Sequence, residues 1–139
     1  MNGNDIVKLA LQSPLHLIMG DTMLITVTGR KTGRKITLPV NFVRDRNTLW
    51  IISSRDRTWW RNLGLGADVN VHLHGNDLKA FGEIVSNEEA VAVQMGEYVR
   101  RLPAAARYMG VRVQNGAPNC EDIARLSKER LFIRICLWP

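Results

Sequence analysis

Short runs of β-branched and aromatic residues, separated by turn residues instead of long helices, constrain the fold of this chain more than any other feature. In the clearest pair, Val69, Val71 and Leu73 alternate with polar residues before a Gly-Asn turn, and the chain returns over residues 78–85. Strands joined by tight turns pair antiparallel, because a parallel pair needs a longer crossover. The same pattern predicts further strands at residues 23–28, 35–43, 48–53 and 131–138.

Helical patterns lie at the flanks of these strands and inside one connection. Residues 4–19 form an amphipathic pattern that Pro14 interrupts, and Ser86 to Glu89 has the S-x-x-E form of a capping box for a helix ending near Arg101. Shorter helical pieces are predicted at residues 58–65, 103–109 and 121–127. In the first of these, Thr58 is the expected N-cap and Gly64 or Gly66 the expected end.

The fold class that follows is mainly β (α+β). About six antiparallel strands with flanking helices close most economically into a small barrel, because closure removes unpaired strand edges. Pro39 lacks a backbone N–H, so it places the strand at residues 35–43 at an edge or next to a bulge.

The length of 139 residues predicts one domain, residues 1–139. We expect no membrane span, because no apolar run approaches the ~18 residues that a bilayer requires. We expect no signal peptide, because the first residues lack its pattern of a basic stretch followed by an apolar one. Cys120 and Cys136 form no C-x-x-C pair, which favours a reduced, cytoplasmic protein. No metal site is expected either, since His72 and His74 share one strand face without a third ligand.

Positive charge is concentrated in one segment. Between Arg30 and Arg61 lie nine basic and two acidic residues, a net charge of +7, whereas ten basic and eleven acidic residues elsewhere nearly cancel. A regional excess of this size indicates an anionic partner, and the alternative is a solvated basic surface. Two classes of partner fit: a nucleic-acid backbone, or a small molecule bearing phosphate or carboxylate.

Two motifs in this segment carry possible binding chemistry. The run Thr28-Gly29-Arg30-Lys31-Thr32-Gly33-Arg34 combines glycines, which allow a tight turn, with cationic donors suited to an anion. Further along, Ser53-Ser54-Arg55 ends a predicted strand and leads into Trp59-Trp60-Arg61-Asn62-Leu63. Phosphate-loop, dinucleotide-binding, zinc-protease and serine-hydrolase motifs are absent from the sequence.

These two motifs, together with Leu38-Pro39-Val40 between them and Val69-Asn70-Val71 after them, occur in a familiar order. The chain resembles the deazaflavin-dependent nitroreductase family, small reductases that use coenzyme F420 and belong among the flavin-binding split β-barrel proteins. The resemblance covers residues 24–85 well and residues 98–108 more weakly. It departs from the family at Ser54–Thr58, where a longer A-S-K-G-G segment is usual and Arg55 stands in place of lysine.

The resemblance implies a split β-barrel and a hydride transfer between reduced F420 and a small organic acceptor, such as a quinone or a nitro compound. F420 carries a phosphate and an acidic tail, which suit the basic segment; FMN is the alternative cofactor. No catalytic residue is assigned, and Tyr98 and Tyr108 are candidate proton donors. A homodimer is implied, because related barrels complete the cofactor site across two chains. The implied cofactor-binding residues are Arg30, Lys31, Thr32, Gly33, Arg34, Thr37, Leu38, Pro39, Ser53, Ser54, Arg55 and Trp59.

Two other functions stay open at this point. A barrel of this kind can bind a cofactor without turnover, and a basic segment can bind nucleic acid. The sequence disfavours nucleic acid, because Trp50 and Phe42 lie in apolar strands and form no evident stacking platform. Membrane contact by the N-terminal segment is disfavoured but stays open as well.

Overall fold

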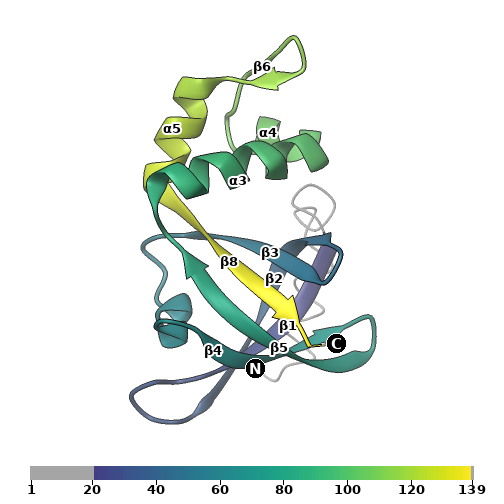
Figure 1. Cartoon of the computed structure of the whole chain (residues 1–139), viewed down its shortest axis with the longest axis vertical. Coiled ribbons are helices and arrows are strands. Elements are labelled where there is room, and N and C mark those ends of the chain that lie inside the picture. Colours follow the sequence, from purple (N-terminus) through teal and green to yellow (C-terminus); the bar gives the residue numbers. More distant parts are fainter. Residues whose placement is uncertain (1–20, 139) are drawn as a thin grey trace.

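The computed structural model describes residues 21–138 and has a six-stranded antiparallel barrel with its α-helices gathered at one end (Figure 1). The strand order around the barrel is β1-β2-β3-β8-β5-β4. The predicted strands and the predicted barrel are therefore confirmed, whereas the predicted helix at residues 4–19 lies outside the described residues. The barrel strands are β1 (Asp21–Thr28), β2 (Lys35–Asp45), β3 (Thr48–Ser54), β4 (Ala67–Leu73), β5 (Asn76–Val85) and β8 (Arg130–Leu137).

The barrel interior follows from alternation along the strands. Residues two apart point to the same face, so Val69, Val71 and Leu73 are buried while the polar residues between them face outward, as predicted. The same alternation buries Ile25 of β1 and Ile133 of β8. These aliphatic side chains form the first of two apolar layers.

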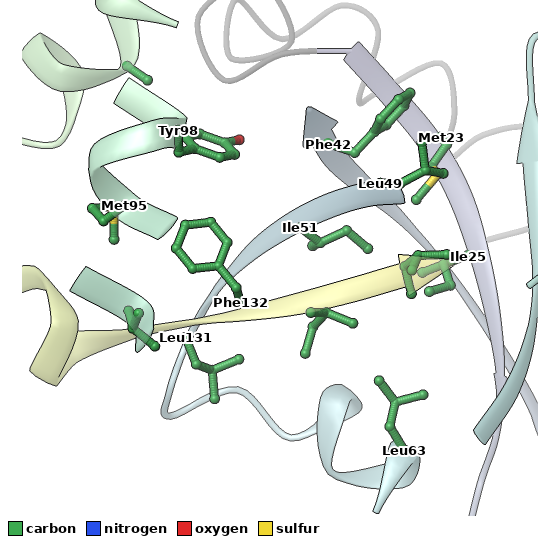
Figure 2. Close-up of a cluster of buried hydrophobic side chains, with 14 of the residues drawn as sticks. Met23, Ile25, Phe42, Leu49, Ile51, Leu63, Met95, Tyr98, Leu131 and Phe132 are labelled. Carbon is green, nitrogen blue, oxygen red and sulfur yellow. The ribbon is translucent and has the colours of Figure 1, made fainter. Parts of the chain in front are cut away.

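A second apolar layer lies between the outer face of the barrel and the helices. Phe132 of β8 packs against Tyr98 of α3 (Glu88–Arg101), with ring centroids 5.6 Å apart, and meets Trp50 of β3 edge-on at 6.1 Å. Figure 2 shows Tyr98 and Phe132 side by side, with Met95 on the same helix. The helical layer is completed by α4 (Pro103–Tyr108) and α5 (Cys120–Glu129).

One predicted helix cap is wrong and another is confirmed. Asn87, not Ser86, is the N-cap of α3, and its side chain accepts a hydrogen bond from the Ala90 amide. Asparagine is at least as good a cap as serine, so the cap lies one residue later than the S-x-x-E pattern suggested. The predicted helix at residues 58–65 is a 3-10 helix, η1 (Trp59–Leu63). Thr58 is its N-cap residue and Gly64 its C-cap residue, as predicted, although the Thr58 side chain makes no capping hydrogen bond.

A short hairpin was not predicted. Strands β6 (Val113–Gln114) and β7 (Ala117–Pro118) project before α5. Asp122 in the first turn of α5 binds Arg112 through both the backbone N–H and the guanidinium, and this ion pair fastens the hairpin to the helix. The guanidinium holds the pKa of the Asp122 carboxyl below its usual value. Two-residue strands carry too little alternation to be seen in a sequence.

Candidate functional site

The barrel opens where β2 and β3 diverge. These strands pair only from Val43↔Trp50 to Asp45↔Thr48; before that, β2 pairs with β1 alone, and β3 continues along β8. A cavity of about 260 Å³ lies in this opening. It is lined by Leu38, Pro39, Val40, Asn41, Ile51, Ile52, Ser53, Ser54, Arg57, Trp59, Tyr108, Met109 and Arg130.

Pro39 is suited to this open edge. The Gly29 amide donates to the Arg34 carbonyl at 2.7 Å, and the β1–β2 register then runs unbroken to Asp21↔Phe42. Because inward and outward backbone pairs alternate along an antiparallel ladder, position 39 faces away from β1 and toward the opening. The proline therefore removes no hydrogen bond from the β1–β2 ladder, which confirms its predicted edge position. Backbone groups of Thr37 and Asn41 face the opening by the same alternation.

The aromatic wall of the cavity is Trp59 at the start of η1, where the side chain is 9% exposed. Its neighbours hold it in place: the Trp60 indole N–H donates to the Ser54 carbonyl at 3.2 Å, and the Asn62 side-chain amide donates to the Trp59 carbonyl at 2.9 Å. Trp60 also carries the Arg61 guanidinium over its ring, 5.3 Å from the centroid. Of the two tryptophans, Trp59 is thus the one that faces both core and cavity.

The charged side chains that line the cavity are all basic. Arg57 and Arg130 line it, and its lining includes no carboxylate. Neither guanidinium forms an ion pair or hydrogen bond within residues 21–138. Ser53 and Ser54 also line the cavity, where the Ser53 hydroxyl donates to the Ser54 carbonyl and the Ser54 hydroxyl donates to Asp56. Aliphatic side chains line the β2 and β3 walls. This donor set suits a ligand that combines a flat apolar ring with an anionic group.

The basic turn between β1 and β2 is a defined structure. The Gly33 amide donates to the Gly29 carbonyl at 2.8 Å, and Gly33 has a φ of 72°, a left-handed conformation that favours glycine. A side chain at Gly29 would crowd Thr32 and Arg34. The Arg30 amide donates to the Asn62 side-chain oxygen at 3.1 Å, so the turn is tied to η1.

The predicted cofactor residues fall into three groups. Leu38, Pro39, Ser53, Ser54 and Trp59 come together around the cavity. The five turn residues are exposed outside it, and the Thr37 side chain hydrogen-bonds Thr26 on the outer face of the barrel. Arg55 does not line the cavity. The turn residues are Arg30, Lys31, Thr32, Gly33 and Arg34.

The two candidate tyrosines lie in different places. Tyr98 is 1% exposed within the second apolar layer, where burial raises the pKa of its phenol. Tyr108 ends α4, lines the cavity and is 58% exposed. Only Tyr108 of the pair is therefore in reach of a molecule bound in the opening.

Sequence reasoning missed several lining residues, above all Arg130. It stands opposite Ser54 in the β3–β8 register, so finding it requires knowing that the last strand pairs with the third. Arg57 was counted in the basic segment but not as a site residue. The other missed residues are Val40, Asn41, Ile51, Ile52 and Met109.

His72 and His74 face solvent. His72 pairs with Asp77 at 2.8 Å and His74 with Asp21 at 2.7 Å. Over residues 21–138 no cluster of three or more His, Cys, Asp or Glu side chains could hold a metal ion. The helices of the same region include none long and apolar enough to cross a membrane.

Comparison with solved structures supports the barrel fold. An F420-H2 dependent reductase, FDR-A, superposes with a TM-score of 0.53 at 18% identity, over 81% of this chain and 92% of that one. A conserved hypothetical protein from Mycobacterium tuberculosis has a TM-score of 0.53 at 15% identity, over 100% of this chain and 82% of its own. The flavocytochrome Anf3 from Azotobacter vinelandii has a TM-score of 0.54 at 11% identity, over 91% and 63%.

The sequence itself identifies the family. A search of curated proteins gives no match. Residues 10–120, however, match the F420H(2)-dependent quinone reductase family, and this match spans the basic turn, both walls of the cavity and Tyr108. The chain therefore belongs to the F420H(2)-dependent quinone reductase family and is an F420-dependent oxidoreductase.

Proposed function

We propose that the opening between β2 and β3 holds the deazaflavin ring of F420 and that the acidic tail extends to the basic turn. The observation that carries this proposal is the course of β2, which leads from Arg34 directly into the cavity lining at Leu38. At about 3.3 Å per residue, these positions are roughly 13 Å apart. An elongated ligand can therefore reach cavity and turn at once.

Each wall has a separate task in this proposal. Backbone groups of Thr37 and Asn41 on the open edge of β2 bind the polar edge of the ring, and Trp59 with Ile51 packs against its apolar part. Reduced F420 supplies the hydride when bound. The side chains of the chain fix the ring, keep water from its buried face and leave the side toward Tyr108 open for the second substrate.

We propose a quinone as that second substrate, with nitro compounds as the alternative acceptors. Tyr108 and Met109 give the open wall a phenol beside an apolar surface, which suits a flat ring with polar oxygens. Tyr108 then donates a proton to the acceptor oxygen. Steady-state assays with F420H2 and a water-soluble quinone or a nitroaromatic, compared through kcat/KM, decide between the two classes.

The binding test is a titration with F420 and, separately, with FMN, followed by ligand fluorescence. We expect F420 to bind at micromolar concentration or tighter and FMN more weakly. In the double variant Arg30→Gln/Lys31→Gln, F420 affinity falls well beyond tenfold, because two charge-assisted contacts are lost. An affinity within twofold of the original contradicts the assignment of the turn as the binding site for the acidic tail. Tighter binding of FMN than of F420 would identify FMN as the cofactor.

We also infer a cytoplasmic homodimer. The dimer proposal is supported by the gap between β2 and β3, which one chain leaves open, since a second chain packed across its mouth completes the walls around the ring. Light scattering of the purified full chain measures the mass, and a species of one chain at micromolar concentration contradicts the proposal.

A further inference from the structure

The arginine that follows β3 is engaged away from the cavity. One guanidinium nitrogen of Arg55, Nη2, donates to the Ser86 carbonyl and to the Ser127 carbonyl, each at 2.8 Å. The Arg55 amide donates to the Glu129 carbonyl at 3.0 Å. Ser127 and Glu129 belong to the last turn of α5, whose carbonyls lack partners within the helix. Arg55 therefore closes the end of α5 and joins it to the β5–α3 connection.

Two other arginines take the position toward the cavity. The Arg57 amide donates to the Ser54 carbonyl at 3.2 Å in the turn after β3, and Arg130 stands opposite Ser54 on β8. Arg57 and Arg130 are thus both backbone neighbours of Ser54, and all three residues line the cavity. A neighbouring hollow is lined by Ser54, Arg55, Asp56, Glu129 and Arg130. There the Ser54 hydroxyl donates to Asp56, and Arg130 pairs with neither carboxylate.

Arg57 is exposed and Arg130 is half-buried, and neither guanidinium has a counter-ion among residues 21–138. Like charges that line one cavity repel each other. An anionic oxygen group between them removes that repulsion and accepts paired hydrogen bonds from a planar fork. The Ser53 and Ser54 side chains border the same space.

We propose that Arg57 and Arg130 bind an anionic group of the bound F420, inside the opening and separate from the basic turn, and that Arg55 has a purely structural role. This inference rests on the proposed function, and it assigns the phosphate to the two arginines and leaves the acidic tail to the turn. The phosphate is nearer to the ring than the tail is, so it belongs at the cavity and not at the exposed turn.

The test compares two probes. F420 carries the phosphate and the tail, whereas FO, the same deazaflavin chromophore with its ribityl chain, carries neither. Fluorescence titrations give the affinities of both for Arg57→Gln, Arg130→Gln and Arg130→Lys. Arg107→Gln is the matched control, since Arg107 is exposed beside Tyr108 but does not line the cavity. Thermal unfolding of each variant checks the fold.

We expect Arg57→Gln and Arg130→Gln each to weaken F420 binding by roughly tenfold, because each removes a hydrogen bond to a charged group. FO binding stays within twofold. Arg130→Lys recovers part of the loss, since it restores the charge without the planar fork. Arg107→Gln changes neither affinity. Arg55→Lys lowers the unfolding temperature and leaves the ratio of F420 to FO affinity unchanged.

Two results separate the possible failures. If the unaltered protein binds no F420, the proposed function fails. If it binds F420 but both glutamine variants keep full affinity, or lose F420 and FO affinity equally while folded, the anion site is wrong and the turn alone holds the charged groups.

Discussion

At the scale of single residues, the two tyrosines separate activity from stability. Tyr108 lines the opening, whereas Tyr98 is packed against Phe132. If Tyr108 donates a proton to the acceptor, Tyr108→Phe lowers kcat/KM for a quinone by about 10²- to 10⁴-fold, the usual contribution of a general acid. F420 affinity is unchanged. Steady-state kinetics at several pH values check this, with Tyr98→Phe as the control that keeps activity; equal losses in both variants contradict the assignment.

The buried phenol of Tyr98 makes the stability of the folded chain depend on pH in the alkaline range. Burial raises the pKa of its phenol above the ordinary value of 10.0, so the folded state holds its proton when the unfolded state has released it. The contribution of Tyr98 is complete below pH 10 and is lost as the pH rises beyond it. We expect the unfolding temperature of Tyr98→Phe to fall less steeply between pH 9 and 11 than that of the original chain. Parallel slopes in the two proteins contradict this.

At the scale of elements, the β6–β7 hairpin depends on the Asp122 carboxylate. It accepts from the Arg112 amide at 2.9 Å and from the Arg112 guanidinium at 2.9 Å. Asp122→Asn removes the charge, so we expect faster hydrogen exchange at Arg112 and Asn119. Because the pKa of Asp122 is lowered, the original chain loses this link only as the pH falls below the ordinary 3.8. Glu121→Gln in the same helical turn is the matched control and leaves the exchange unchanged.

The strands also show which parts of the fold could be predicted from the sequence. Strand existence and pairing of neighbours could be predicted, because alternation of Val69, Val71 and Leu73 with polar residues is a local signal. Pairing between strands far apart in the sequence could not be predicted. The pairing of β3 with β8, which places Arg130 beside Ser54, is of this kind. Arg55 was expected in the site from its position after β3, but carbonyls at the end of α5, far along the chain, engage it. Cavity residues on β2 were found through the family resemblance and not through periodicity.

At the scale of the whole molecule, the concentrated positive charge predicts how affinity responds to salt. The basic turn is exposed, so its attraction for the acidic tail is screened over a Debye length of about 10 Å at 0.1 M salt. The cavity contacts to the ring are partly buried and apolar, and salt affects them little. F420 affinity should therefore fall steeply between 0.05 and 0.5 M NaCl, roughly tenfold or more, and rise with the number of glutamates in the tail.

FO provides the internal reference for this prediction, because it lacks every charged group that the turn could bind. We expect its affinity to stay within about twofold over the same salt range, since apolar and hydrogen-bonded contacts dominate it. Isothermal titration at three salt concentrations measures both ligands in the same protein. A salt dependence of equal slope for FO and F420 would place the charge effect at the ring itself, which would remove the separate role of the basic turn. In Arg30→Gln/Lys31→Gln the salt dependence of F420 affinity should decrease toward that of FO. The two charges that salt screens in the original chain are absent from this variant.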